Sequence, residues 1–137
     1  MIIVSACLAG INCRYDGENN FHPKIIKLVE EGNAIPVCPE QLGGLSTPRI
    51  PAEIIGDKIL NENGEDVTEF FLRGALETLK IAKLVSCQKA IFKSNSPSCG
   101  SGKIYDGTFS GKLTDGKGIC TRILEKHNIR VITENDI

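Results

Sequence analysis

The chain has 137 residues and a net charge of −1, from 16 basic and 17 acidic side chains. A domain of this size buries about 68–70% of its unfolded surface, so it can fold without a disulfide or a metal. The charge balance argues against a general nucleic-acid coat or a membrane-surface protein and leaves room only for a local basic patch. Aromatic residues make up 5% of the chain and tryptophan is absent, which disfavours a platform on which bases stack.

The sequence also carries no targeting or membrane signal. No run of about 18 apolar residues occurs, so no transmembrane helix is predicted. The N-terminus, from Met1 to Cys7, has no basic segment and leads directly into an apolar run, unlike a signal peptide. We therefore expect a single domain over residues 1–137, in the cytoplasm and without membrane contact. Because cytoplasmic thiols stay reduced, the six cysteines are expected to be ligands, nucleophiles or buried apolar residues rather than three disulfides.

The first predicted elements are a strand, a loop, a helix and a second strand. Residues 2–4 form a short apolar run typical of a buried parallel strand, and a glycine-containing loop follows from Cys7 to Gly17. A helix is expected over residues 23–31, because Pro23 suits its first position and Gly32 suits the position after its end. Residues 34–37 are expected to form the second strand.

The middle of the chain combines a loop, a hairpin and a helix. Residues 39–51 are predicted to be irregular, and long loops of this kind are usually functional or disordered. Gly56-Asp57 is a good two-residue turn between two short strands. The next helix is expected to start at an Asp66 cap, with Glu69 completing a capping box, and to run to about Val85.

The last third of the chain completes an alternating pattern. Residues 90–92 are expected to be the third core strand, and residues 95–118 are predicted to be mostly loop. A final helix over residues 117–127 ends at Asn128 in the left-handed conformation, and residues 129–132 form the last strand. This order predicts an α/β fold with three layers: a mostly parallel, Rossmann-like four-stranded sheet, helices on both faces and a small β-hairpin insertion.

Three cysteines lie where predicted strands end. Cys7 and Cys38 follow the first two strands, and Cys99 follows the third after a short polar turn. Ligands of open α/β sheets collect outside the carboxyl ends of parallel strands, so three thiols there predict a site for a soft metal. Three ligands would leave one coordination position open for chemistry. No C-x-x-C pair occurs, which excludes zinc ribbons and thioredoxin-type motifs.

The remaining candidates are less specific. Cys87 and Cys120 are interpreted as small buried apolar residues. Cys13 shares the loop of Cys7, and its expected role is open between a neighbour of the ligands, a fourth ligand and a spare thiol. Glu40 lies two residues after Cys38, where a carboxylate can serve proton transfer or be an ordinary loop side chain. Arg49 can offset negative charge at the site, bind a phosphate or form a structural ion pair.

Several multi-residue segments, in this order along the chain, resemble one family. They are Ser5-Ala6-Cys7-Leu8-Ala9-Gly10 with Arg14-Tyr15-Asp16-Gly17, Pro36-Val37-Cys38-Pro39-Glu40 with Gly43-Gly44-Leu45 and Thr47-Pro48-Arg49, and Ser96-Pro97-Ser98-Cys99-Gly100 with Ile104-Tyr105-Asp106-Gly107 and Gly116-Lys117-Gly118. Together they resemble the thiouracil desulfidase (TudS-like) family over nearly the whole chain, with no departure at the cysteine motifs.

The resemblance implies both a cofactor and a reaction. The cofactor is a [4Fe-4S] cluster held by Cys7, Cys38 and Cys99, with one iron left open. The reaction removes sulfur from thiolated uracil, as the free base, in a nucleoside or within RNA, and the resemblance assigns Glu40 and Ser98 to catalysis. An open iron would bind the soft thiocarbonyl sulfur as a Lewis acid, and water would replace the sulfur without an external electron donor.

The remaining expectations concern the surroundings of this site. Glu40 would carry protons, and Ser98 would bond the substrate or relay a proton. Asn95 and Ser96 are expected to bind substrate, while three residues are expected just behind the site: Cys13, Asp16 and Arg49.

Two other functions stay open: a non-enzymatic sensing module, with Cys13 completing the ligation of a cluster, and a structural zinc protein. The partner is expected to be a small thiolated pyrimidine or a thiouridine-containing substrate, and the charge gives no indication of RNA contact.

Overall fold

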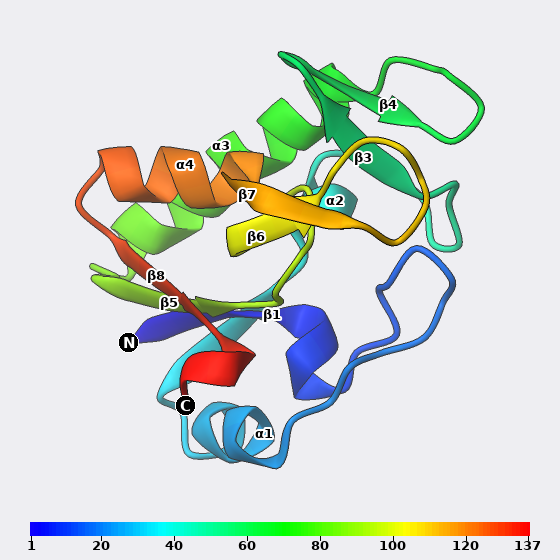
Figure 1. Ribbon diagram of the computed structural model, residues 1–137. Helices are drawn as coiled ribbons and strands as arrows, with labels where there is room; N and C mark the ends of the chain where they lie inside the picture. Colours follow the sequence, from blue (N-terminus) through cyan, green and yellow to red (C-terminus); the bar gives the residue numbers. More distant parts are fainter.

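Four parallel strands form the central sheet of the computed structural model, which describes residues 1–137 (Figure 1). The strands are β1 (Ile2–Ser5), β2 (Ala34–Val37), β5 (Lys89–Phe92) and β8 (Arg130–Thr133), and their order in the sheet is β2-β1-β5-β8. All three neighbouring pairs are parallel. The short apolar runs of the sequence suit strands that are covered on both faces.

Helices cover both faces of the sheet, as predicted (Figure 1). α1 (Pro23–Glu30) and the 3-10 helix η1 (Ala6–Ala9) lie on one face, and α3 (Thr68–Leu84) and α4 (Ile119–Lys126) lie on the other. Successive residues of a strand point to opposite faces. Accordingly, Val4 packs in the hydrophobic cluster between the sheet and α1, and Ile3 packs in the larger cluster between the sheet and the helices α3 and α4.

A short helix replaces part of the loop predicted over residues 39–51. α2 (Pro39–Leu42) starts directly after β2, with Pro39 in its first turn, where a missing N–H costs no hydrogen bond. α2 packs tightly against α3 because two glycines allow their backbones to touch, Gly43 at Phe70 and Gly74 at Pro39. Such backbone contacts depend on tertiary structure and leave no apolar pattern in the sequence.

Two antiparallel hairpins project from the sheet and its helices (Figure 1). The predicted hairpin is present as β3 (Ala52–Ile55) and β4 (Lys58–Asn61), joined by Gly56-Asp57. The prediction of mostly loop over residues 95–118 is wrong, because β6 (Ser101–Tyr105) and β7 (Leu113–Lys117) pair there. These two strands are largely exposed and contain glycine, so the alternation that marks a half-buried strand is missing.

The structure corrects the predicted start of α3 and confirms the predicted end of α4. The capping box predicted at Asp66 does not form: Asp66 accepts a hydrogen bond from the Thr68 N–H at 3.0 Å, but Val67 occupies the cap position. Asn128 follows α4 with φ 62°, the left-handed conformation that was predicted. A further element, η2 (Glu134–Asp136), follows β8. None of the helices has the length and apolar character needed to cross a membrane.

Candidate metal centre

The strand order brings the three strand-end cysteines together. β2, β1 and β5 precede Cys38, Cys7 and Cys99, and these three strands are adjacent and parallel, so their carboxyl ends share one edge of the sheet. A pocket of about 480 Å³ opens at this edge, and all three thiols line it. The meeting of distant thiols at one rim, expected from the sequence, is therefore observed.

Each of these cysteines is held by a different local structure. Cys7 lies in η1, directly after β1, and Cys38 is the N-cap residue of α2. Cys99 is 5% exposed and lies in the loop before β6. Its N–H donates to the Ser96 hydroxyl at 3.0 Å, and its carbonyl accepts from the Thr121 hydroxyl at 2.9 Å. Burial raises the pKa of the Cys99 thiol well above its ordinary value.

Cys13 is a fourth thiol in the same pocket and is only 2% exposed. A hydrogen bond from the Cys13 thiol lowers the pKa of Cys38 to about 7, against the opposing effect of burial. A similar bond lowers the pKa of Cys7, and sharing its proton with Cys38 and Cys7 raises the pKa of Cys13 itself. The loop of Cys13 thus lies against two of the strand-end thiols, and the Cys38 thiol donates a hydrogen bond to the Cys13 carbonyl at 3.8 Å.

The spacing of the four pocket thiols indicates which kind of metal site they can form. Nowhere in the structure are three or more Cys, His, Asp or Glu side chains grouped closely enough for a single metal ion. An iron–sulfur cluster binds each thiolate through a different iron atom, so its ligands lie farther apart than those of one ion. Four thiols around one pocket therefore fit a cluster better than a mononuclear site.

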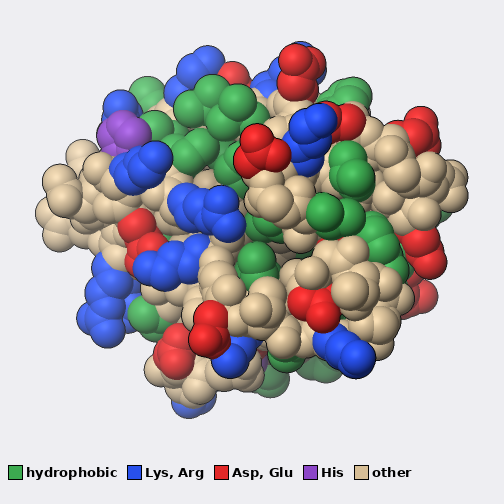
Figure 2. Space-filling model, turned by 45° about the horizontal axis from the view of Figure 1, so that its top comes forward, with side chains coloured by type: hydrophobic (Ala, Val, Ile, Leu, Met, Phe, Trp, Pro, Cys, Tyr) green, Lys and Arg blue, Asp and Glu red, His purple; other side chains and the backbone are tan.

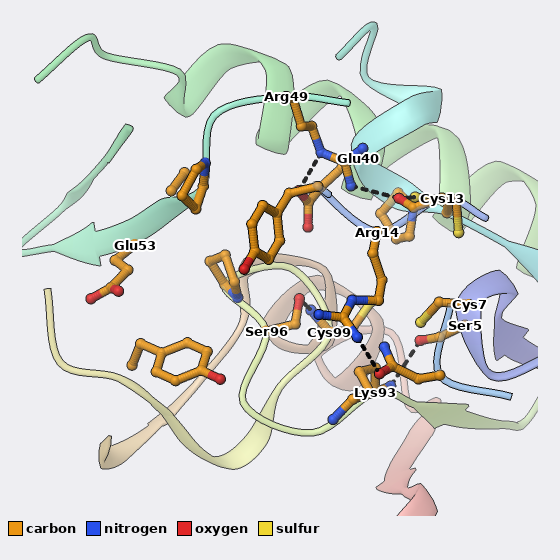
Figure 3. A pocket seen from close by; sticks show the side chains of 18 of the residues that line it. Ser5, Cys7, Cys13, Arg14, Glu40, Arg49, Glu53, Lys93, Ser96 and Cys99 are labelled. Carbon is orange, nitrogen blue, oxygen red and sulfur yellow. Dashed lines mark hydrogen bonds and ion pairs between the residues drawn. The ribbon is translucent and has the colours of Figure 1, made fainter. Parts of the chain in front are cut away.

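Glu40 and Arg49 form an ion pair on the wall of this pocket (Figure 3). Arg49 Nε donates to Glu40 Oε1 at 3.0 Å, and the two side chains are 8% and 18% exposed. The guanidinium also donates to the Cys13 carbonyl at 2.8 Å and to the Thr47 hydroxyl at 2.8 Å. Of the roles considered for Arg49, the structure therefore shows the structural ion pair.

The two serines before Cys99 have different surroundings. Ser96 lines the pocket, and its hydroxyl oxygen accepts hydrogen bonds from the N–H groups of Ser98 and Cys99 at 3.1 and 3.0 Å. With both lone pairs occupied, the Ser96 hydroxyl proton remains available to a ligand. Ser98 is 1% exposed and does not line the pocket, and its hydroxyl oxygen has no hydrogen-bond partner.

Comparison with known proteins places this pocket in context. A family model described as 2-thiouracil desulfurase matches residues 2–136. The chain belongs to the 2-thiouracil desulfurase family. A Bacillus subtilis (strain 168) protein described as "Uncharacterized protein YbbK" is 51% identical, with 100% of this chain and 97% of that protein covered. A solved structure of a [4Fe-4S]-dependent thiouracil desulfidase, TudS, is 44% identical with a TM-score of 0.95, covering 99% of this chain and 91% of that chain.

Besides Ser98, two residues expected at or just behind the site of this desulfurase-family protein do not line its pocket. Asn95, with φ 70°, forms a bridge to Ile104 of β6. Asp16 lies at the surface and pairs with Arg14 at 3.0 Å. Arg14 does line the pocket, so Asp16 contacts a pocket residue without reaching the pocket itself.

Lys93 and Ser5 line the pocket but were not singled out from the sequence. Lys93 follows β5, its N–H donates to the Ser5 hydroxyl at 2.8 Å, and its ammonium pairs with Glu134 at 2.9 Å. The positive charge of Lys93 also contributes to the lowered pKa of Cys7, after the larger effect of the Cys13 hydrogen bond. The sequence does carry a signal for Lys93: it follows a buried apolar strand directly, and the carboxyl ends of such strands form ligand sites.

The hairpins supply the other side of the pocket. Glu53 of β3, Tyr105 of β6 and Phe109 of the turn between β6 and β7 all line it. Their participation depends on how the two hairpins pack together, which no local pattern in the sequence indicates.

Proposed function

We propose that this protein is a [4Fe-4S]-dependent desulfidase that replaces the sulfur of a thiolated uracil with oxygen from water. The carrying observation is that Cys7, Cys38 and Cys99 meet in one pocket at the carboxyl ends of three adjacent strands. Membership of the 2-thiouracil desulfurase family and the likeness to TudS support the proposal. These three cysteines would hold the cluster, because thiolates are its usual protein ligands.

The cluster, when bound, supplies an iron atom without a protein ligand, a Lewis acid suited to a soft thiocarbonyl sulfur. Glu40 then has the central role among the protein's own groups. Its Oε1 is held by Arg49, so its other oxygen is available to take a proton from water as the water adds to the thiocarbonyl carbon. The carbon–sulfur bond would then break as the carbon–oxygen double bond forms and the added hydroxyl gives up its proton. The sulfur would leave as hydrogen sulfide with both protons of the water, one of them returned by Glu40. A positioned acid–base group of this kind contributes roughly 10²–10⁴-fold to the rate.

A serine hydroxyl is the second polar group proposed for the reaction. The resemblance assigned this role to Ser98, but Ser96 is the serine that lines the pocket. Because two backbone N–H groups occupy the lone pairs of the Ser96 oxygen, its proton can donate to an oxygen or nitrogen of the substrate. We therefore assign substrate binding and orientation to Ser96, with Ser98 buried behind it.

We propose a small thiolated pyrimidine or thiouridine compound as the substrate, handled in the cytoplasm, where thiols stay reduced. The net charge of −1 gives no sign of a nucleic-acid surface. On the face shown in Figure 2, several Lys and Arg side chains gather on the left of the view, and most Asp and Glu side chains lie to the right and below. The balanced net charge of the whole chain favours a small substrate over RNA.

Cys13 supports one alternative function. Since this thiol lines the same pocket, it is available as a fourth ligand, and a fully ligated cluster would suit a sensing module without catalysis. The two functions differ in whether any iron remains open to a substrate.

The test is anaerobic reconstitution of the protein with iron and sulfide, followed by incubation with 4-thiouracil and 4-thiouridine. We expect loss of the thiocarbonyl absorbance and release of one sulfide for each substrate consumed. Glu40→Ala should keep the iron content and lose turnover. If the protein carries an intact cluster and leaves both compounds unchanged, the desulfidase proposal fails and the sensing module is favoured.

A further inference from the structure

The ammonium group of Lys93 is held in place from outside the pocket. Glu134 Oε2 pairs with Lys93 Nζ at 2.9 Å, and Nζ also donates to the hydroxyl and the carbonyl of Ser94 at 3.0 and 3.3 Å. These acceptors use all three N–H bonds of the ammonium. Lys93 is therefore placed to act through its charge rather than by donating a hydrogen bond to a bound molecule.

Glu134 holds the residues that follow β5 as one unit. Its Oε1 accepts from the Ser94 N–H at 2.7 Å, and its Oε2 accepts from the Ser94 hydroxyl at 2.9 Å. The Glu134 side chain is 14% exposed and does not line the pocket, whereas Lys93 does. Because Glu134 belongs to η2, which follows β8, the strand beside β5, the C-terminal element fixes a charge at the edge of the pocket.

Lys93 lies on the same side of the pocket as Cys7 (Figure 3). The Lys93 N–H donates to the hydroxyl of Ser5, two residues before Cys7, at 2.8 Å. The hydrogen bond of the Cys13 thiol is the largest cause of the lowered pKa of Cys7, and the charge of Lys93 acts in the same direction. The Lys93 charge thus reaches a proposed ligand of the cluster.

The other cations of the pocket have different partners. Arg49 pairs with Glu40, which lines the pocket itself, so these two charges largely cancel there. Arg14 lies in a loop and pairs with the exposed Asp16, where water weakens the effect of charge. The charge of Lys93, with its partner behind the pocket wall, is the one fixed beside a core strand.

We propose that Lys93 balances the negative charge of the iron–sulfur cluster and that Glu134 is the positioning residue that fixes this charge beside Cys7. The inference rests on the proposed function, because it assumes a [4Fe-4S] cluster held by Cys7, Cys38 and Cys99. Their thiolates carry more negative charge than the oxidised core carries positive charge, so the cluster would be anionic. A fixed cation makes such a cluster easier to reduce and its open iron a stronger Lewis acid.

The test is the reduction potential of the anaerobically reconstituted protein, from a redox titration followed by electron paramagnetic resonance. Lys93→Met should make one-electron reduction about 10-fold or more less favourable, which lowers the potential by about 59 mV or more. Lys93→Arg keeps the charge and should stay near the wild type. The control, Lys80→Met, removes a lysine of α3 that pairs with Glu77 and does not line the pocket, so the potential should not change.

Glu134→Gln should shift the potential in the opposite direction. It removes a negative charge while Ser94 still accepts hydrogen bonds from Lys93, so the potential should rise. A merely structural role of the pair would not produce shifts of opposite sign. The double variant Lys93→Met/Glu134→Gln leaves neither charge without its partner, so it keeps the test available if Lys93→Met does not fold. Its potential should lie below that of Glu134→Gln alone.

An unchanged potential in Lys93→Met would overturn the inference, and so would a double variant with the potential of Glu134→Gln. Failure of the proposed function gives a different result, because the potential is measured without substrate. A protein whose potential follows these charges but which leaves 4-thiouracil and 4-thiouridine unchanged supports the charge role and contradicts the desulfidase. A protein that desulfurates them while Lys93→Met keeps the wild-type potential supports the desulfidase and contradicts the charge role.

Discussion

Gly74 of α3 lies against the carbonyl of Pro39 in α2 with no space for a side chain between them. Gly43 makes the reciprocal contact, with the carbonyl of Phe70. α2 begins directly after Cys38 and carries Glu40. This contact between two helix backbones thus holds Cys38, a proposed ligand, and Glu40, the proposed catalytic carboxylate, close to α3, the longest helix of the fold.

Gly74→Ala should therefore destabilise the protein, although glycine-to-alanine changes inside a helix ordinarily stabilise it by about 1 kcal/mol. The new methyl group would overlap the Pro39 carbonyl, and overpacking of this kind costs about 1–3 kcal/mol. Urea unfolding of the cluster-free protein measures the difference. Lys83→Ala, at an exposed position of the same helix, is the control and should change stability by less than about 0.5 kcal/mol. A Gly74→Ala variant as stable as the wild type would contradict the close contact.

The ligand assignment predicts a clear division among the cysteines. Single alanine substitutions of Cys7, Cys38 or Cys99 should greatly reduce the iron and acid-labile sulfide retained after anaerobic reconstitution, because each removes one corner of the proposed ligation. Cys120→Ala is the matched control, since Cys120 is fully buried between the sheet and its helices and does not line the pocket. It should keep the wild-type iron content. Normal iron binding by Cys38→Ala would show that the assignment is wrong.

Cys13 should be dispensable for holding the cluster. If three cysteines are the ligands, Cys13→Ala keeps four irons per chain, and the cluster changes its reduction potential because a polar thiol beside Cys7 and Cys38 is lost from the pocket. Cys13→Ser keeps a polar side chain there, so its reduction potential should lie closer to that of the wild type. Iron analysis and a redox titration followed by electron paramagnetic resonance measure both quantities. Loss of the cluster in Cys13→Ala would instead favour the closed, sensing site.

Arg49 should be needed for both stability and turnover. Arg49→Met would leave Glu40 without its cation on a largely buried wall, and breaking a buried ion pair costs about 3–5 kcal/mol. Arg49→Lys keeps the charge but cannot form the planar set of bonds to Glu40, the Cys13 carbonyl and Thr47, so an intermediate loss is expected. Urea unfolding, iron content and kcat are measured together. Equal stability of Arg49→Met and the wild type would contradict this role.

Glu134 provides a prediction about pH. Burial acts to raise its pKa, but hydrogen bonds from Lys93 and Ser94 outweigh this effect and leave the pKa lowered. A carboxyl group whose pKa is lower in the folded state stabilises the fold above its unfolded pKa of about 4.3, and this contribution is lost as the pH falls through the folded value. Glu134→Gln should therefore cost about 1–3 kcal/mol at pH 7.

The same comparison at acid pH provides the check on Glu134. The difference in unfolding free energy between the wild type and Glu134→Gln should shrink as the pH falls below about 4. Urea unfolding of the cluster-free proteins at several pH values measures it. A difference that is constant with pH would mean that the ionised carboxylate is not the stabilising form.

The sequence alone was sufficient for the sheet and for the cysteines that follow its strands. Short apolar runs bounded by turn residues predict buried parallel strands, and parallel strands place their carboxyl ends on one edge. From that rule the positions of Cys7, Cys38 and Cys99 predicted a common rim, and the family resemblance agrees with the later comparisons. The β6–β7 hairpin was missed, because exposed, glycine-containing strands have no alternating apolar face.

Only the tertiary structure decided how the side chains around that rim are arranged. Ser96 rather than Ser98 lines the pocket, and Glu53 reaches it from a hairpin more than 50 residues away from the turn it binds. Periodicity in a sequence reports which face of an element is buried, so it locates strands and their ends. Contacts between loops, hairpins and touching backbones depend on three-dimensional packing, and they leave no period in the sequence from which they could be read.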